Sequence, residues 1–180
     1  MTKKIERTAY HEAGHAVASH HLRVAFSSIT IIPKQDSSGH VMHPKSIFNN
    51  FDPEWDNSLR VVDRAERMIL VLLAGQVAEA KFADRHNWMG SGEDWHTVIK
   101  LASYFVGSDE VLQAYVNYLW ARAKTLFDLP WLWVAVEAVA KELLIRKKMG
   151  NRLTRSIIQK AIDDDFKRRR ESTQKKKRRS

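Results

Sequence analysis

Three side chains near the N-terminus have the types and spacing that can hold a metal ion and activate water. They are His11, Glu12 and His15, in an H-E-x-x-H run inside the segment 8–17. In a helix, positions four apart lie on the same face, so the two imidazoles can bind one divalent ion. Glu12 lies about 100° around the helix axis, where it can act as general base on a water beside the ion without binding the ion itself.

Chance does not account for this run. With 8 His and 10 Glu in 180 residues, the product of the residue frequencies gives about 0.02 such runs in the chain. The alternative interpretation is a pair of surface histidines without a metal, and the low chance frequency favours a metal site.

A third ligand must come from elsewhere in the chain, because a catalytic zinc site combines three protein ligands with an open position for water. A carboxylate is an accepted third ligand, and Asp94 follows the polar segment 85–92 at the start of an expected helix. The competing candidates are His96 and, after it, Glu93. Asp94 also has a structural interpretation, as a first-turn residue in a capping box that begins at Ser91.

The hydrophobic pattern predicts a mainly α fold with a small β-sheet, which is an α+β class. Helices are expected over residues 2–22, 58–83, 91–106, 109–127, 130–149 and 154–166, with Gly150 as the stop of the fifth and Thr154 as the N-cap of the last. Strands are expected at 28–33 and 39–44, and a loop at 45–57. Because two strands alone are marginal in water, we expect them to pack on the helices with room for a third strand. Their free edge could accept an extended peptide.

The helix over residues 58–83 is the expected core helix, since its run Met68–Ala74 is apolar on most sides. Glu79 lies near the end of this helix and has two interpretations of equal weight. It is either an exposed charge or a carboxylate that supports a histidine ligand.

The composition narrows the class of protein. A chain of 180 residues with 44% hydrophobic residues is expected to form one domain. Cysteine is absent, so disulfides and thiolate zinc sites are excluded, and the composition suits a reducing, cytoplasmic location. The longest apolar runs, at 68–78 and 131–136, are too short to span a bilayer, and no signal peptide is recognisable.

The positive charge is concentrated at the C-terminus. Residues 167–180 hold nine Lys or Arg and one acidic residue, and so account for +8 of the formal net charge of +9. We therefore expect a domain of residues 1–166 and a basic tail of residues 167–180, disordered or a frayed extension of the last helix. The cluster from Lys167 to Arg179 could bind nucleic acid or an anionic surface, and a solvated extension is the alternative.

Several segments, taken in order, resemble the peptidase domain of FtsH-type zinc proteases. They are residues 7–16, 29–33, 73–79 and 90–94, with further similarity at 140–144 and 153–154. The resemblance covers most of residues 7–165. It implies a mostly helical peptidase domain that binds one zinc ion through His11, His15 and Asp94. It also implies that Glu12 activates the water and that Glu79 is a supporting carboxylate. Gly75 lies where the family commonly has a glycine-rich start, and the sequence alone gives it no function.

The departures from this family are informative. FtsH-type proteases carry an ATPase module and membrane anchors, whereas this sequence has no G-x-x-x-x-G-K-[ST] phosphate loop and its motif begins seven residues from the start. The sequence therefore predicts an ATP-independent zinc endopeptidase for flexible or unfolded proteins. The family's peptidase domains form hexamers, so a homo-oligomer is expected if its contacts survive without the module. The alternatives are a regulatory peptidase that cuts one partner, and a binding or adaptor protein that acts through the basic tail.

Overall fold

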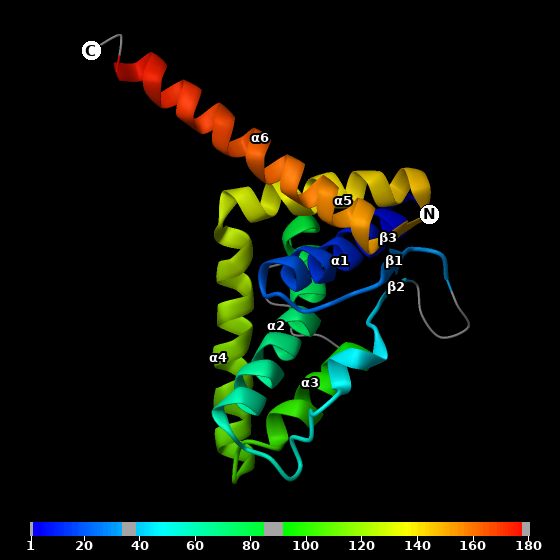
Figure 1. Cartoon of the computed structure of the whole chain (residues 1–180), viewed down its shortest axis with the longest axis vertical. Helices are drawn as coiled ribbons and strands as arrows, with labels where there is room; N and C mark the ends of the chain where they lie inside the picture. Colours follow the sequence, from blue (N-terminus) through cyan, green and yellow to red (C-terminus); the bar gives the residue numbers. More distant parts are fainter. Residues whose placement is uncertain (1, 34–38, 85–91, 178–180) are drawn as a thin grey trace.

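Six α-helices and three short strands form the part of the chain that the computed structural model describes, which is residues 2–33, 39–84 and 92–177 (Figure 1). The elements are α1 Thr2–His21, β1 Ser28–Thr30, β2 His40–Met42, the 3-10 turn η1 Lys45–Phe48, α2 Leu59–Phe82, α3 Glu93–Ser103, α4 Asp109–Asp128, α5 Pro130–Arg146, β3 Lys148–Gly150 and α6 Asn151–Lys177. The predicted fold class, mainly α with a small β-sheet, is confirmed.

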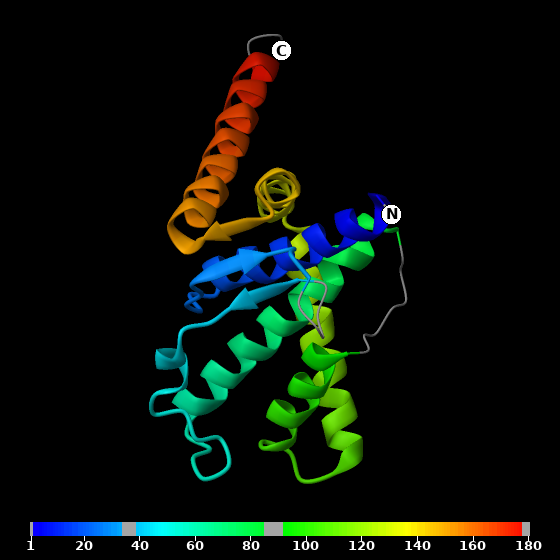
Figure 2. The same ribbon diagram turned by 90° about the vertical axis from the view of Figure 1, so that its right-hand side faces the viewer.

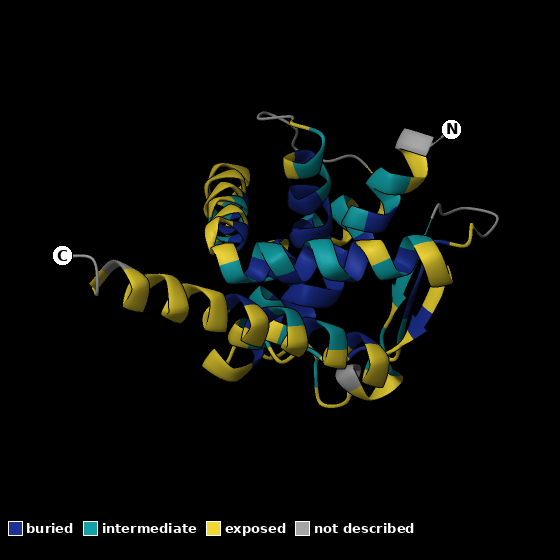
Figure 3. Ribbon diagram, turned by 90° about the horizontal axis from the view of Figure 1, so that it is seen from above, coloured by how far each residue is buried: buried dark blue, intermediate teal, exposed yellow. Residues whose placement is uncertain are grey.

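The core is built around the contact between α1 and α2. Ala9, Ala13 and Ala16 recur at helical spacing on α1 and are fully buried, which presents a face of small residues. Leu73 and Ala74 of α2 pack on this face and are also fully buried. In Figure 1, α4 runs along the outer side of α2, and α5 covers α1 from the other direction. Figure 3 shows the buried residues gathered where these helices meet.

The backbones of α1 and α2 approach each other most closely at Gly14. A Cβ atom at this position would lie 2.5 Å from the carbonyl oxygen of Ala74 and 2.6 Å from the Cβ of Ala78. Only a residue without a side chain allows this approach, so Gly14 sets the distance between the two central helices.

The sheet has the strand order β2-β1-β3 and is antiparallel throughout (Figure 2). Ser28 of β1 pairs with Met42 on one side and Gly150 on the other. Among the described residues, β2 is therefore an edge strand. The first strand is shorter than expected, because it ends at Thr30 and not at residue 33.

The third strand takes residues that the sequence assigned to a helix. The helix expected over residues 130–149 ends at Arg146, and Lys147 adopts a left-handed conformation with φ 65°. Tertiary contacts explain this correction: the backbone N–H of Ile31 donates to the Lys147 carbonyl at 2.9 Å, and Met149 is buried against the core. Pairing with β1 satisfies the backbone that a longer helix would have satisfied internally.

The last helix also differs from the prediction. It begins at Asn151 and not after an N-cap at Thr154, which is buried inside the helix with its hydroxyl donating to the Gly150 carbonyl at 3.0 Å. The helix continues past Phe166 to Lys177, so the described part of the tail is a helical extension. Every helix in the described ranges is too short or too polar to cross a membrane.

The close approach of α1 and α2 makes a prediction about stability. Gly14→Ala should destabilise the protein by about 1–3 kcal/mol, because the added methyl meets a backbone oxygen that cannot move without shifting α2. Thermal or urea unfolding followed by circular dichroism measures the change. Gly107→Ala is the matched control, since a Cβ there meets nothing within 4 Å, and it should alter stability by less than about 0.5 kcal/mol. Equal stability of the two variants would contradict the packing described.

Candidate metal centre

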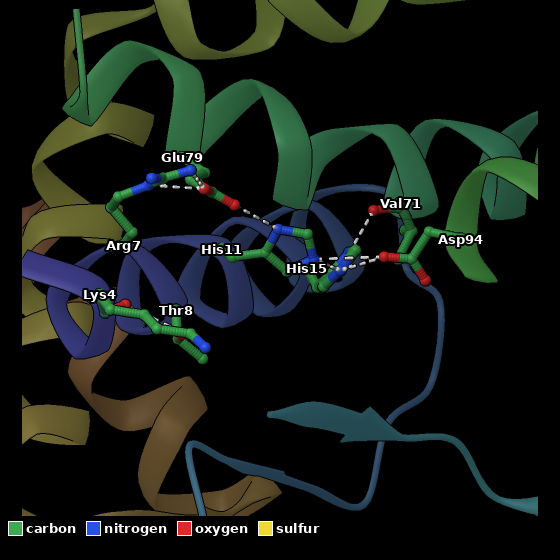
Figure 4. A network of polar contacts seen from close by, with 8 residues as sticks. All are labelled: Lys4, Arg7, Thr8, His11, His15, Val71, Glu79 and Asp94. Carbon is green, nitrogen blue, oxygen red and sulfur yellow. Dashed lines mark hydrogen bonds and ion pairs between the residues drawn. The ribbon is translucent and has the colours of Figure 1, made fainter. Parts of the chain in front are cut away.

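Three side chains from two helices, α1 and α3, converge next to α2. His11 and His15 lie one turn apart on α1 with their Nε2 atoms 3.0 Å apart. The Oδ2 atom of Asp94, from the first turn of α3, lies 3.2 Å from each of these nitrogens (Figure 4). Within the described part of the chain, these residues form a group of three side chains that could hold a metal ion.

The hydrogen bonds of the two imidazoles decide which nitrogens face the centre of this group. The Nδ1 of His15 lies 2.7 Å from the carbonyl oxygen of Val71, which can only accept, so Nδ1–H donates. The Nδ1 of His11 lies 3.3 Å from Oε2 of Glu79 and donates in the same way. In the neutral rings, both Nε2 atoms then carry only a lone pair. The lone pairs of the two Nε2 atoms and an oxygen of the Asp94 carboxylate therefore face one another, and a cation between them would be bound favourably.

The donor set fits zinc. Zinc binds imidazole nitrogen and carboxylate oxygen at about 2.0–2.2 Å in tetrahedral geometry, which places neighbouring ligand atoms roughly 3.3 Å apart. The three separations here, 3.0, 3.2 and 3.2 Å, are close to that value. Three protein ligands also leave the fourth position open, as in catalytic zinc sites.

The electrostatics of the group favour positive charge at its centre. Burial lowers the pKa of His11, but hydrogen bonds with Asp94 and Glu79, together with the negative charges of Glu12 and Asp94, outweigh burial and raise the pKa to about 10. Burial raises the pKa of Asp94, but the positive charges of His15 and His11 and their hydrogen bonds hold that pKa well below its usual range. A metal ion at this position would bind in competition with a proton.

Glu79 supports His11 and is itself held by Arg7. The Nε of Arg7 donates to Oε1 of Glu79 at 2.8 Å, while the other carboxylate oxygen faces His11. Although burial raises the pKa of Glu79, the hydrogen bonds and positive charges of His11 and Arg7 together lower it further than burial raises it. Of the two interpretations of Glu79, the structure has the one in which it contacts a histidine. Arg7 was not among the residues predicted for the site, although its position four residues before His11 places it on the same helix face.

Gly75 brings the backbone of α2 directly under the two imidazoles. A Cβ atom at Gly75 would lie 2.4 Å from Nε2 of His15 and 2.9 Å from Nε2 of His11. No function was predicted for this residue from the sequence. Its only signal in the sequence is its place four residues before Glu79, which puts both on one face of α2.

Glu12 faces a cavity of about 970 Å³ that all three candidate ligands line. Its side chain is buried, and Oε2 has no hydrogen-bond partner among the described residues. The Oε1 of Gln76, which also lines the cavity, lacks a partner in the same part of the chain. Burial raises the pKa of Glu12 more than the charges of His15 and His11 lower it. Oε2 of Glu12 can therefore accept a hydrogen bond from a water or from a substrate N–H in the cavity.

The other candidates for third ligand lie elsewhere. His96 is exposed, and its Nδ1 lies 2.9 Å from the carbonyl oxygen of Gly92. Glu93 is exposed at the start of α3. Gly92, with φ 115°, takes the N-cap position that the sequence analysis gave to Ser91, which lies outside the described residues. The structure brings Asp94, and neither alternative, to the two histidines.

The comparisons with known proteins point to one family. The model of peptidase family M41 matches residues 1–109, which is more than half of the chain and includes α1, α2 and α3. The chain belongs to peptidase family M41. This agrees with the resemblance to FtsH-type peptidase domains, and it makes the chain a metallopeptidase of a zinc-dependent family that acts on protein substrates. No curated protein matches the chain.

Removing the carboxylate of Asp94 tests the candidate metal centre of this M41 peptidase. Asp94→Ala should lower zinc affinity by more than about 100-fold, which exceeds the loss expected when only a supporting side chain is removed. A competition titration with a zinc indicator measures the affinity, and elemental analysis gives the zinc content. Glu93→Ala, one residue away and exposed, is the control and should bind zinc as the unchanged protein does. Zinc affinity that survives Asp94→Ala but falls in His96→Ala would assign the ligand to His96.

Gly75→Ala should separate metal binding from folding. The three atoms nearest to the added methyl all belong to the imidazoles of His11 and His15, so the rings must move and zinc affinity should fall at least about 10-fold. Alanine also favours the helix over glycine by up to about 1 kcal/mol, so the melting temperature of the metal-free protein should stay the same or rise. Unchanged zinc affinity would show that α2 does not form the floor of the site.

Proposed function

We propose that this M41 peptidase is an ATP-independent zinc endopeptidase that hydrolyses peptide bonds in flexible or unfolded proteins. The observation that carries the proposal is the buried carboxylate of Glu12, whose Oε2 has no hydrogen-bond partner among the described residues and which shares one cavity with the His11, His15 and Asp94 group. A site that only bound a metal would have no need of this carboxylate.

The residues divide the chemistry between them. His11, His15 and Asp94 would hold the zinc ion, which when bound supplies a Lewis acid for the scissile carbonyl and for a water. Glu12 accepts the proton of the attacking water and then donates it to the leaving amine. Its raised pKa suits this exchange, because a buried carboxylate takes up a proton more readily than an exposed one.

Supporting residues keep the ligands in place. Glu79 and the Val71 carbonyl accept from the Nδ1 atoms of the two histidines, so both rings keep Nε2 directed at the centre. Arg7 in turn keeps Glu79 ionised and oriented.

The edge strand β2 offers a way to align the substrate. The same cavity that the candidate ligands line is also lined by Gly39, His40, Val41 and His43. A Cβ at Gly39 would lie 2.8 Å from Oε1 of Glu12, so the start of this strand passes directly beside the proposed base. An extended peptide that paired with β2 would run past Glu12 and present its backbone to the centre. This mode requires an extended chain, which is why we propose unfolded or flexible substrates.

No nucleotide is needed in this proposal. The sequence contains no phosphate loop, and the peptide enters by strand pairing alone. A homo-oligomer and a cytoplasmic location stay predictions from the sequence. The adaptor alternative would leave the centre catalytically silent, and the same assay distinguishes the two functions.

Replacing Glu12 by its amide tests the proposal. The unchanged protein loaded with zinc should cleave unfolded casein without any nucleotide. Glu12→Gln should bind zinc normally but cleave at least about 100-fold more slowly, because the amide cannot accept the proton of the water. Gel electrophoresis of the casein fragments and elemental analysis of the variant give the two readouts.

The control for this experiment is Glu54→Gln, the same change at an exposed site in the loop before α2. It should cleave as the unchanged protein does. Turnover by Glu12→Gln at the unchanged rate would remove Glu12 from its role. No cleavage by the zinc-loaded, unchanged protein would favour the adaptor function.

A further inference from the structure

The second half of α6 stands clear of the rest of the molecule. Thr154, Ile158 and Ile162 anchor the first half against α5. From Phe166 to Lys177, by contrast, every side chain that the structure describes is exposed. Figures 1 and 2 show this part of the helix projecting away from the other elements, and Figure 3 shows it uniformly exposed. We call residues 167–177 the basic segment.

Several positive charges of the basic segment have no ion-pair partner in the described part of the chain. The acidic residues of α6 lie mainly just before the basic segment, where Asp164 pairs with Lys160, and Asp165 with Arg168 and Arg169. Lys167, Arg170 and Lys175 have no ion-pair partner among the described residues, and Glu171 is the one acidic residue of the basic segment. The charges of Lys167, Arg170 and Lys175 therefore remain available to an anionic partner.

The shape of the basic segment selects among anionic partners. A helix that inserts into a membrane surface needs an apolar face as well as a basic one, and no residue of 167–177 is apolar. Four consecutive cations, at 167–170, instead cover about 300° of the helix circumference. A helix with cations all around suits a partner that places phosphates on both of its sides.

We propose that the basic segment binds double-stranded DNA by lying in its major groove. An α-helix with its side chains is about 10–12 Å across, and the major groove of B-form DNA is about 12 Å wide with phosphates along both walls. The basic segment extends for about 16 Å at 1.5 Å per residue, which is long enough to meet several phosphates. Recognition is by charge, without sequence preference, and is independent of the peptidase activity.

Fluorescence anisotropy with a labelled 25-base-pair duplex of arbitrary sequence tests the proposal on the full-length protein. With about five phosphate contacts, the logarithm of the binding constant should fall against the logarithm of salt concentration with a slope near −4.5. Affinity should therefore fall about 500-fold between 50 and 200 mM salt. An RNA duplex should bind more weakly, because its deep and narrow major groove does not admit a helix.

A triple variant locates the binding surface. Lys167→Gln, Arg170→Gln and Lys175→Gln together remove three unpaired charges while keeping good helix formers, and should reduce the magnitude of the salt slope by about 2.7. The matched control is Lys100→Gln, Lys124→Gln and Lys141→Gln, three exposed lysines on other helices, which should keep both affinity and slope. Circular dichroism and zinc content should be the same for both triple variants.

Three results would overturn the proposal. The first is no binding to the duplex at 50 mM salt. The second is equal loss of binding in both triple variants, which would mean that net charge and not the basic segment is responsible. The third is binding of phosphatidylserine vesicles or RNA duplex as tight as that of DNA at the same salt, which would contradict docking in the major groove.

Discussion

The candidate site depends on how closely α1 and α2 pack. Gly14 allows the backbone of α2 to touch α1, and Gly75 lets the same backbone pass under the imidazoles of His11 and His15. This approach is what brings the Val71 carbonyl and Glu79 within reach of the two rings. Because the two rings are held in place, both Nε2 atoms point to one position. Asp94 of α3 supplies the third donor atom there. The close packing of α1 and α2 therefore determines the geometry of the donor group.

Charge balance explains why a divalent cation suits this centre. Glu12, Glu79 and Asp94 bring three negative charges and Arg7 one positive charge, so with neutral imidazoles the group carries −2. Carboxylates that are partly or fully removed from water cost free energy unless a cation compensates them. Arg7 compensates Glu79 directly, and a divalent ion between the remaining groups would bring the total to zero. The same ion would relieve the contact of two lone pairs with a carboxylate oxygen.

The local sequence pattern was enough to predict features that depend on a single segment of the chain. The periodic residues of α1 and α2 and the H-E-x-x-H spacing each depend on one segment, so the sequence predicted the helices and the shared face of His11 and His15. The candidacy of Asp94 came from the type of residue that zinc accepts, and the family resemblance strengthened it. Features that arise from contacts between distant segments were not predicted: the residues that form the third strand (β3), the start of α6, and the positions of Arg7 and Gly75. In β3, pairing with β1 overrides a helical pattern that continues through Met149. The closeness of Gly75 to the imidazoles depends on the crossing of two helices, which no local pattern contains.

The central claim is that His11, His15 and Asp94 hold one zinc ion. Anomalous diffraction at the zinc absorption edge, from crystals of the zinc-loaded protein, tests it most directly. We predict a single strong peak at about 2.0–2.2 Å from Nε2 of both histidines and from a carboxylate oxygen of Asp94. A peak at other residues would contradict the claim, as would an Asp94 carboxylate more than about 6 Å from both imidazoles with no ion between them.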